Sequence, residues 1–135
     1  MSARFLLDTN ICVYIRQNRP AAVLARFRRL QPGDAVLSLI TYGELVYGVQ
    51  KSQHKARALQ ELSELIQLIP VALLPEESAA VYGESRANLG LQGQMMGNND
   101  LWIAAHAKAS NLTLVTNNER EFKRIPGLKI ENWVK

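Results

Sequence analysis

The sequence predicts an α/β protein with three layers, α/β/α, in which helices cover both faces of a mostly parallel central sheet. Short apolar segments of strand length alternate along the chain with longer segments whose apolar residues recur at helical spacing. Parallel strands need such helical connections between them. The 135 residues are 47% hydrophobic and 21% charged, which is ordinary for a globular protein, so we expect one domain over residues 1–135.

The first half of the chain is expected to contain two strands and four helices. In order, these are a strand at 4–7, helices at 10–17 and 20–30, a strand at 35–40, and helices at 41–51 and 54–66. Pro20 suits the first turn of a helix, and Pro32 with Gly33 makes a turn before the second strand. Thr41 is the expected N-cap of the third helix.

The second half continues the alternation. In order, we expect a strand at 70–74, a helix at 75–89, a loop at 90–98, a helix at 100–110, a strand at 112–116, a helix at 119–124 and an edge strand at 128–130. The loop contains three glycines, and Asn98 or Asn99 is the expected cap of the helix after it. That helix is apolar nearly all round, which indicates that it is buried.

The net charge of +4 is unevenly distributed. Residues 1–60 hold nine basic and three acidic side chains, a net +6, whereas the remainder holds seven and nine, a net −2. A basic half suggests a polyanionic partner, although an ordinary solvated surface also explains it. Cys12 is the single cysteine, and the first apolar run stops at Asp8, so we expect a cytosolic protein without a signal peptide or membrane span.

Acidic residues follow the expected strands. Asp8 comes directly after the first strand, Glu44 lies soon after the second, and Asp100 begins the apolar helix. Thr116 ends the strand at 112–116, and the carboxyl ends of parallel strands lie at one sheet edge, where such folds bind ligands. Carboxylates held close together cannot all stay ionised at neutral pH unless a cation binds them, and ligands that are all oxygen favour Mg²⁺ or Mn²⁺.

Each acid also has a structural interpretation. Asp8 can cap the helix that follows it, and Thr41-x-x-Glu44 has the pattern of a capping box. Asp100 can complement a helix dipole. The metal hypothesis therefore depends on all three acids lying at equivalent strand ends. Arg86 can reach the carboxylates and contact a substrate phosphate, or it can pair with Glu84 or Glu119.

Four segments occur in an order that is typical of one family. They are FLLDTN at 5–10, SLITYGELVYG at 38–48, GNNDLWIAAHA at 97–107, and LVTNNEREF at 114–122 followed by PGL at 126–128. Together they resemble PIN-domain ribonucleases, in particular the VapC toxins of bacterial type II toxin–antitoxin pairs. The resemblance covers nearly the whole chain, and although one motif alone would be weak, the set of four is specific.

The resemblance implies a PIN fold and cleavage of RNA, such as tRNA or another translation RNA, by an endonuclease that needs Mg²⁺ or Mn²⁺. It implies that Asp8 and Asp100 are the principal metal ligands and that Glu44 completes the site directly or through a water. Thr116 would orient a carboxylate or a water. It also implies a VapB-like antitoxin as partner, and a homodimer.

One position departs from the family pattern. Many PIN domains have an aspartate two residues after this threonine, where this chain has Asn118. Glu119 or Glu121 can take its place, or a second metal binds weakly. Asn118 also favours an alternative, a PIN module that binds RNA or antitoxin without cutting. A receiver-like signalling domain ranks last, because it would need an acidic pair after the first strand, where only Asp8 is present.

Overall fold

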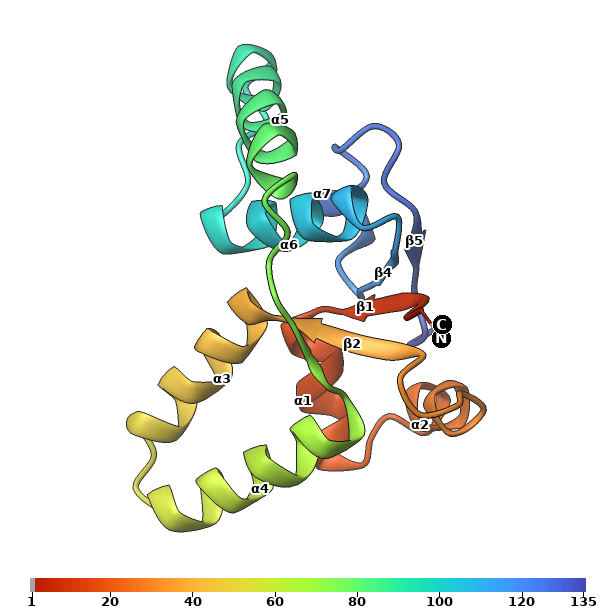
Figure 1. Ribbon diagram of the computed structural model, residues 1–135, viewed down its shortest axis with the longest axis vertical. Helices are drawn as coiled ribbons and strands as arrows, with labels where there is room; N and C mark the ends of the chain where they lie inside the picture. The colour runs from red at the N-terminus through yellow and green to blue at the C-terminus, as the bar shows by residue number, and fades with distance from the viewer. Residues whose placement is uncertain (1) are drawn as a thin grey trace.

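The structure is a computed structural model that describes residues 2–135. The elements, in chain order, are β1 (Phe5–Leu7), α1 (Thr9–Gln17), α2 (Ala21–Arg28), β2 (Ala35–Ser38), α3 (Leu39–Gln50), α4 (Lys55–Leu68), β3 (Val71–Ala72), α5 (Ser78–Gln92), α6 (Asn98–Ala109), β4 (Thr113–Val115), α7 (Glu119–Phe122) and β5 (Ile130–Glu131) (Figure 1).

The five strands form one sheet in the order β3-β2-β1-β4-β5, and every neighbouring pair is parallel. The central strand β1 is paired on both sides, so Leu6 lies in register with Val36 and with Leu114. The predicted α/β class with a mostly parallel sheet is therefore confirmed. All five carboxyl ends lie at the same edge, where β1, β2 and β4 lead into the segments that carry the predicted acids.

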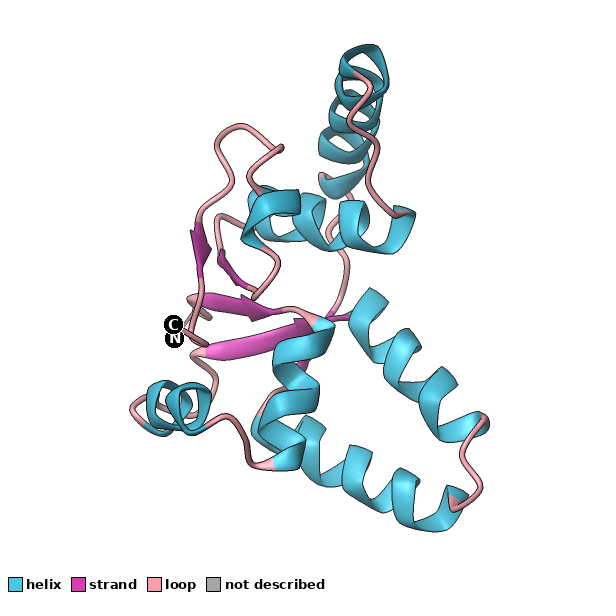
Figure 2. Cartoon of the chain, turned by 180° about the vertical axis from the view of Figure 1, so that it is seen from behind, coloured by secondary structure: helices cyan, strands magenta, loops and turns pink. Residues whose placement is uncertain are grey.

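The sheet separates two cores. Side chains alternate between the faces of a strand, so Phe5 and Leu7 pack with α1 to α4, while Leu6 and Leu114 pack with α5, α6 and α7. Figures 1 and 2 show these two groups of helices on opposite sides of the strands. In residues 2–135 no helix combines the length and hydrophobicity that crossing a bilayer requires.

Helix α3 begins two residues earlier than predicted. Its N-cap is Ser38, whose Oγ accepts a hydrogen bond from the Ile40 amide at 3.2 Å, so the expected cap Thr41 lies inside the helix. The capping-box interpretation of Thr41 and Glu44 is therefore wrong. Ser38 Oγ is also 2.9 Å from His106 Nδ1, a buried contact that joins the start of α3 to α6.

The segment before α6 also differs from prediction. Helix α5 continues to Gln92, past the predicted end at residue 89, and Gly93 ends it at φ +67°, a conformation that glycine adopts without a steric penalty. Helix α6 has Gly97 as its N-cap without a side-chain hydrogen bond, so neither Asn98 nor Asn99 caps it. The last strand is β5 at Ile130–Glu131 and not 128–130.

Candidate functional site

Asp8 lies at the carboxyl end of β1 and caps α1. Its Oδ1 accepts a hydrogen bond from the Ile11 amide at 2.9 Å, and the carboxylate also accepts one from the Thr116 hydroxyl at the end of β4. The side chain is buried, and this burial raises the pKa of Asp8, with a smaller contribution from the negative charge of Glu44. Asp8 therefore caps α1 and also lies at the sheet edge where the metal site was predicted.

Glu44 projects from α3 toward the starts of two other helices. Its Oε1 accepts a hydrogen bond from the Thr9 hydroxyl at 2.5 Å, and its Oε2 accepts one from Asn99 Nδ2 at 3.4 Å. Thr9 is the residue after Asp8, and Asn99 is the residue before Asp100. These two contacts therefore place the Glu44 carboxylate between Asp8, which follows β1, and Asp100 in α6.

Asp100 lies in the first turn of α6 and is half-buried. Burial is the main reason that its pKa rises to about 7, and the charge of Glu121 and a hydrogen bond with that carboxyl group raise it further. The charges of Glu44 and Asp8 add smaller increases to the pKa of Asp100. Four acidic side chains thus interact electrostatically at one edge of the sheet.

The two glutamates that follow Asn118 have different surroundings. Glu121 Oε2 accepts a hydrogen bond from Asn118 Nδ2 at 2.7 Å, and Glu121 Oε1 is buried with no N–H or hydroxyl donor. Glu119 instead contacts Lys135 at 2.8 Å and Asn132 at 3.0 Å, and the Lys135 contact is the main reason that its pKa is lowered. The geometry therefore places Glu121, and not Glu119, beside Asp100.

The donor chemistry of these side chains suits a hard divalent cation. Asp8, Glu44, Asp100 and Glu121 offer only carboxylate oxygens, and within residues 2–135 none of the four forms an ion pair. A buried carboxylate oxygen without a donor, as in Glu121, is a group that a cation would satisfy. Over the described part of the chain, however, no three Asp, Glu, His or Cys side chains form a group that could hold an ion as they stand.

Arg86 lies on α5 and is held by an aromatic side chain. It donates to the Tyr82 hydroxyl at 2.8 Å, which in turn lies 3.3 Å from Asn98 Oδ1 at the start of α6. The Tyr82 ring stacks on Trp102 with centroids 3.8 Å apart. Neither of the surface pairings predicted for Arg86, with Glu84 or with Glu119, is formed, and its side chain is exposed near the helix end that carries Asp100.

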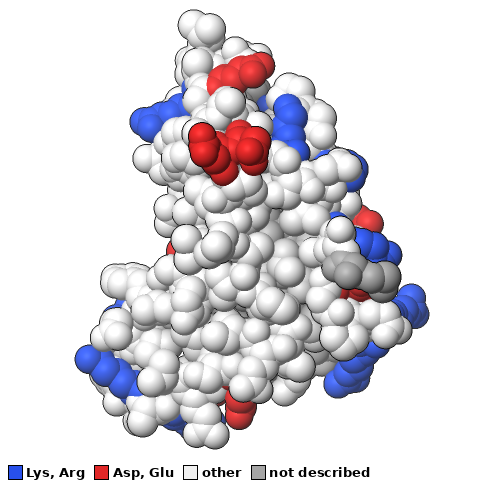
Figure 3. Space-filling model, in the orientation of Figure 1, with Lys and Arg blue, Asp and Glu red and all other residues white. Residues whose placement is uncertain are grey.

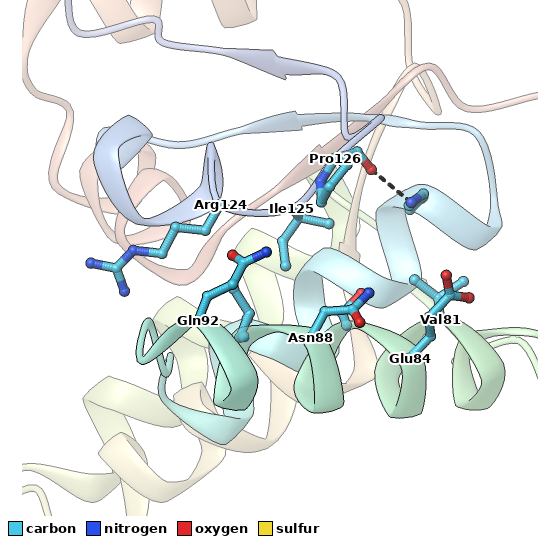
Figure 4. A pocket seen from close by; sticks show the side chains of 10 residues that line it. Val81, Glu84, Asn88, Gln92, Arg124, Ile125 and Pro126 are labelled. Carbon is cyan, nitrogen blue, oxygen red and sulfur yellow. Dashed lines mark hydrogen bonds between the residues drawn. The ribbon is translucent and has the colours of Figure 1, made fainter.

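An open groove of about 640 Å³ lies beside Glu44. It is lined by Leu39, Ile40, Gly43, Glu44, Tyr47 and Asn99. A separate cavity of about 220 Å³ lies between α5 and the loop after α7, with Lys108 donating to the Pro126 carbonyl at its side (Figure 4). That cavity contains none of the four clustered carboxylates, so the groove beside Glu44 is the candidate functional site.

Residues 5–128 match the model of the PIN domain. The chain belongs to the PIN-domain family. The match includes all four carboxylates described above, and the resemblance to PIN-domain ribonucleases is thereby confirmed. The parallel sheet that gathers the acids is consistent with this family.

VapC ribonucleases are similar to this PIN domain over nearly its whole length. Ribonuclease VapC2 of Haemophilus influenzae is 39% identical over 131 residues, covering 97% of this chain and 98% of that protein. The tRNA(fMet)-specific endonuclease VapC of Shigella flexneri is 42% identical over 130 residues, covering 96% of this chain and 98% of that protein. Such identity over full length indicates a shared fold and a comparable arrangement of side chains.

Solved structures give the same result. The chain matches the structure of DNA-bound VapBC from Salmonella typhimurium with a TM-score of 0.90 and 39% identity, covering 97% of this chain and 98% of that one. It matches VapBC2 from Rickettsia felis, bound to a promoter DNA fragment, with a TM-score of 0.88 and 40% identity, covering 96% and 98%. Both of these structural neighbours are VapBC complexes.

Three polar residues of the PIN-domain site were not singled out from the sequence. They are Thr9 and Asn99, which contact Glu44, and Tyr82, which holds Arg86. Thr9 and Asn99 each adjoin a predicted acid, and that adjacency was the available signal. No pattern in the sequence marks Tyr82, because its role depends on how α5 crosses α6.

Proposed function

We propose that this chain is a metal-dependent endoribonuclease, one PIN domain over residues 1–135, and the toxin of a type II toxin–antitoxin pair. The observation that carries the proposal is the cluster of four carboxylates at one sheet edge, none of them in an ion pair within residues 2–135. The relatives named ribonuclease and tRNA-specific endonuclease support it. Their names also make tRNA or another translation RNA the first substrate to test.

The metal would be Mg²⁺, with Mn²⁺ able to replace it. Asp8 and Asp100 would be its principal ligands, and Glu44 and Glu121 would complete the site. When bound, such an ion polarises a phosphodiester and lowers the pKa of an attacking water. The protein's own contribution is to orient the oxygens: Thr116 donates to Asp8, and Asn118 donates to Glu121 at 2.7 Å. The residue that departs from the family pattern thus positions the glutamate that replaces the missing aspartate.

The test of this function is cleavage of purified tRNA with Mg²⁺, with Mn²⁺ and with EDTA, using Asp8→Asn as the inactive variant. Asparagine is chosen because its side-chain oxygen can still accept from the Ile11 amide and keep the α1 cap. We expect EDTA to stop cleavage and Asp8→Asn to slow it at least about 100-fold, as for loss of a group that stabilises charge in the transition state.

Circular dichroism of the Asp8→Asn protein serves as the control that the fold is retained. RNA binding without cleavage in either metal would favour the alternative, a PIN module that binds RNA or antitoxin without cutting. Cleavage by folded Asp8→Asn at the wild-type rate would remove Asp8 from the site.

Arg86 is proposed to contact a substrate phosphate. We expect Arg86→Gln to weaken RNA binding and to reduce the slope of log affinity against log salt by about 1, the effect of one lost phosphate contact. The matched control is Arg57→Gln on α4, because Arg57 is also exposed and its contact to Glu61 is a long 3.8 Å. Filter binding over a salt series measures both, and equal slopes in the two variants would contradict the proposal.

The partners we propose are a VapB-like antitoxin, because two solved relatives are VapBC complexes, and a second copy of this chain. The basic residues do not form one continuous track on the face in Figure 3, where they lie mainly around the edges.

An antitoxin encoded in the neighbouring reading frame should bind this chain and suppress the cleavage of tRNA described above. Failure of that antitoxin to bind would contradict the proposed pairing.

A further inference from the structure

A chain of two hydroxyl groups ends on the Glu44 carboxylate. Thr9 Oγ1 lies 2.5 Å from Glu44 Oε1 and 3.2 Å from Thr41 Oγ1. A hydroxyl carries a single hydrogen and a carboxylate only accepts, so the Thr9 hydrogen goes to Glu44 and the Thr41 hydrogen goes to Thr9. The order of donation is therefore from Thr41, through Thr9, to Glu44.

The two threonines are fixed by different parts of the fold. Thr41 is fully buried in the first turn of α3, the helix that carries Glu44 one turn later. Thr9 begins α1 directly after Asp8. The chain of hydroxyls consequently ties the free end of the Glu44 side chain to the element that carries Asp8.

Glu44 needs such an anchor because little else orients its carboxylate. In residues 2–135 the only other side-chain hydrogen bond to Glu44 comes from exposed Asn99 at 3.4 Å, which is long for such a bond. A half-buried glutamate has three rotatable side-chain bonds, and an unanchored one would lose that freedom on binding an ion. A charge-assisted hydrogen bond of 2.5 Å selects one orientation in advance.

We propose that Thr9 and Thr41 are positioning residues that hold Glu44 in the orientation needed to bind the cation together with Asp8 and Asp100. This inference rests on the proposed function and adds to it two residues that would not contact metal or RNA. Partners that orient a metal-binding side chain typically alter metal affinity by about 10- to 100-fold when they are lost.

The experiment compares Thr9→Val with Thr9→Ser. Valine keeps the branched shape and removes the hydroxyl, whereas serine keeps the hydroxyl. We expect Thr9→Val to weaken Mn²⁺ binding, measured by isothermal titration calorimetry, about 10-fold or more, and Thr9→Ser to restore it to within about 3-fold of wild type. The Mg²⁺ concentration for half-maximal cleavage should shift by the same factor, with an unchanged KM for RNA at saturating metal.

The control is Thr113→Val, which makes the same substitution at the amino end of β4, opposite the acidic edge, and should leave Mn²⁺ affinity unchanged. Thr41→Val removes only the second hydroxyl and should weaken Mn²⁺ binding less than Thr9→Val does. If Thr9→Val does not fold, Thr41→Val is tested in its place.

If folded Thr9→Val binds Mn²⁺ with wild-type affinity, the inference is overturned while the proposed function stands. If Thr9→Val does not fold, the same result for Thr41→Val overturns the inference. A wild-type protein that neither binds Mn²⁺ nor cleaves RNA would overturn both.

Discussion

Asp100→Asn is expected to reduce RNA cleavage at least about 100-fold and, in the presence of EDTA, to make the protein more stable than wild type at pH 8. The pKa of Asp100 is raised to about 7, so the folded state favours its neutral form. The stabilisation from this group is full below the unfolded pKa, near 4, and is lost as the pH rises through about 7. Asparagine is neutral throughout and avoids that loss.

Thermal unfolding at pH 5 and pH 8 measures this effect. In EDTA the Tm of Asp100→Asn should exceed that of wild type at pH 8, and the difference should shrink at pH 5. The control is Asp34→Asn, which should destabilise at pH 8, because hydrogen bonds from Gln31 and Arg4 lower the pKa of Asp34 and its ionised form stabilises the fold. Wild-type cleavage by Asp100→Asn, or no gain in Tm at pH 8, would contradict the assignment.

Glu121→Gln is expected to reduce cleavage about 10- to 100-fold at limiting Mg²⁺, while Glu119→Gln remains within about 2-fold of wild type. The two glutamates lie on the same short helix, but only Glu121 interacts with Asp100. Glu119 makes surface contacts with Lys135 and Asn132, and contacts of this kind are screened by solvent and contribute little to stability.

The measurement is the cleavage rate over a Mg²⁺ series for both variants and for wild type. Removing the charge of Glu121 should also raise the Tm in EDTA at pH 8, because it relieves the repulsion of Asp100. If Glu119→Gln is the more damaging of the two, the fourth acid has been assigned to the wrong glutamate.

The sequence was informative where a residue's position follows from strand ends. Apolar runs of strand length alternating with amphipathic segments lead to a parallel sheet, and a parallel sheet brings the segments after β1, β2 and β4 to one edge. Asp8 and Glu44 could therefore be grouped from the sequence alone, and Asp100 could be added because it begins α6, the helix that leads back to the amino end of β4. In the structure these three carboxylates do interact, because the charge of Glu44 raises the pKa of both Asp8 and Asp100.

Details that depend on competing hydrogen bonds were not predictable in this way. Thr41 has the residue type and spacing of a cap, but Ser38 contacts both the Ile40 amide and His106, and β2 ends at Ser38, two residues earlier than predicted. The choice between Glu119 and Glu121 depends on where Lys135 lies, at the far end of the chain. Arg86 is captured by Tyr82 one helical turn away, a contact that competes with the pairings expected from charge alone.

The strand order has a consequence for the synthesis of this protein. The central strand β1 is made first but gains its second neighbour only when β4 appears, after more than a hundred residues of translation. Thr116 and Glu121 emerge later still. A nascent chain would therefore have an incomplete acidic edge until residues 113–121 have left the ribosome, and it could form the candidate site only after that point.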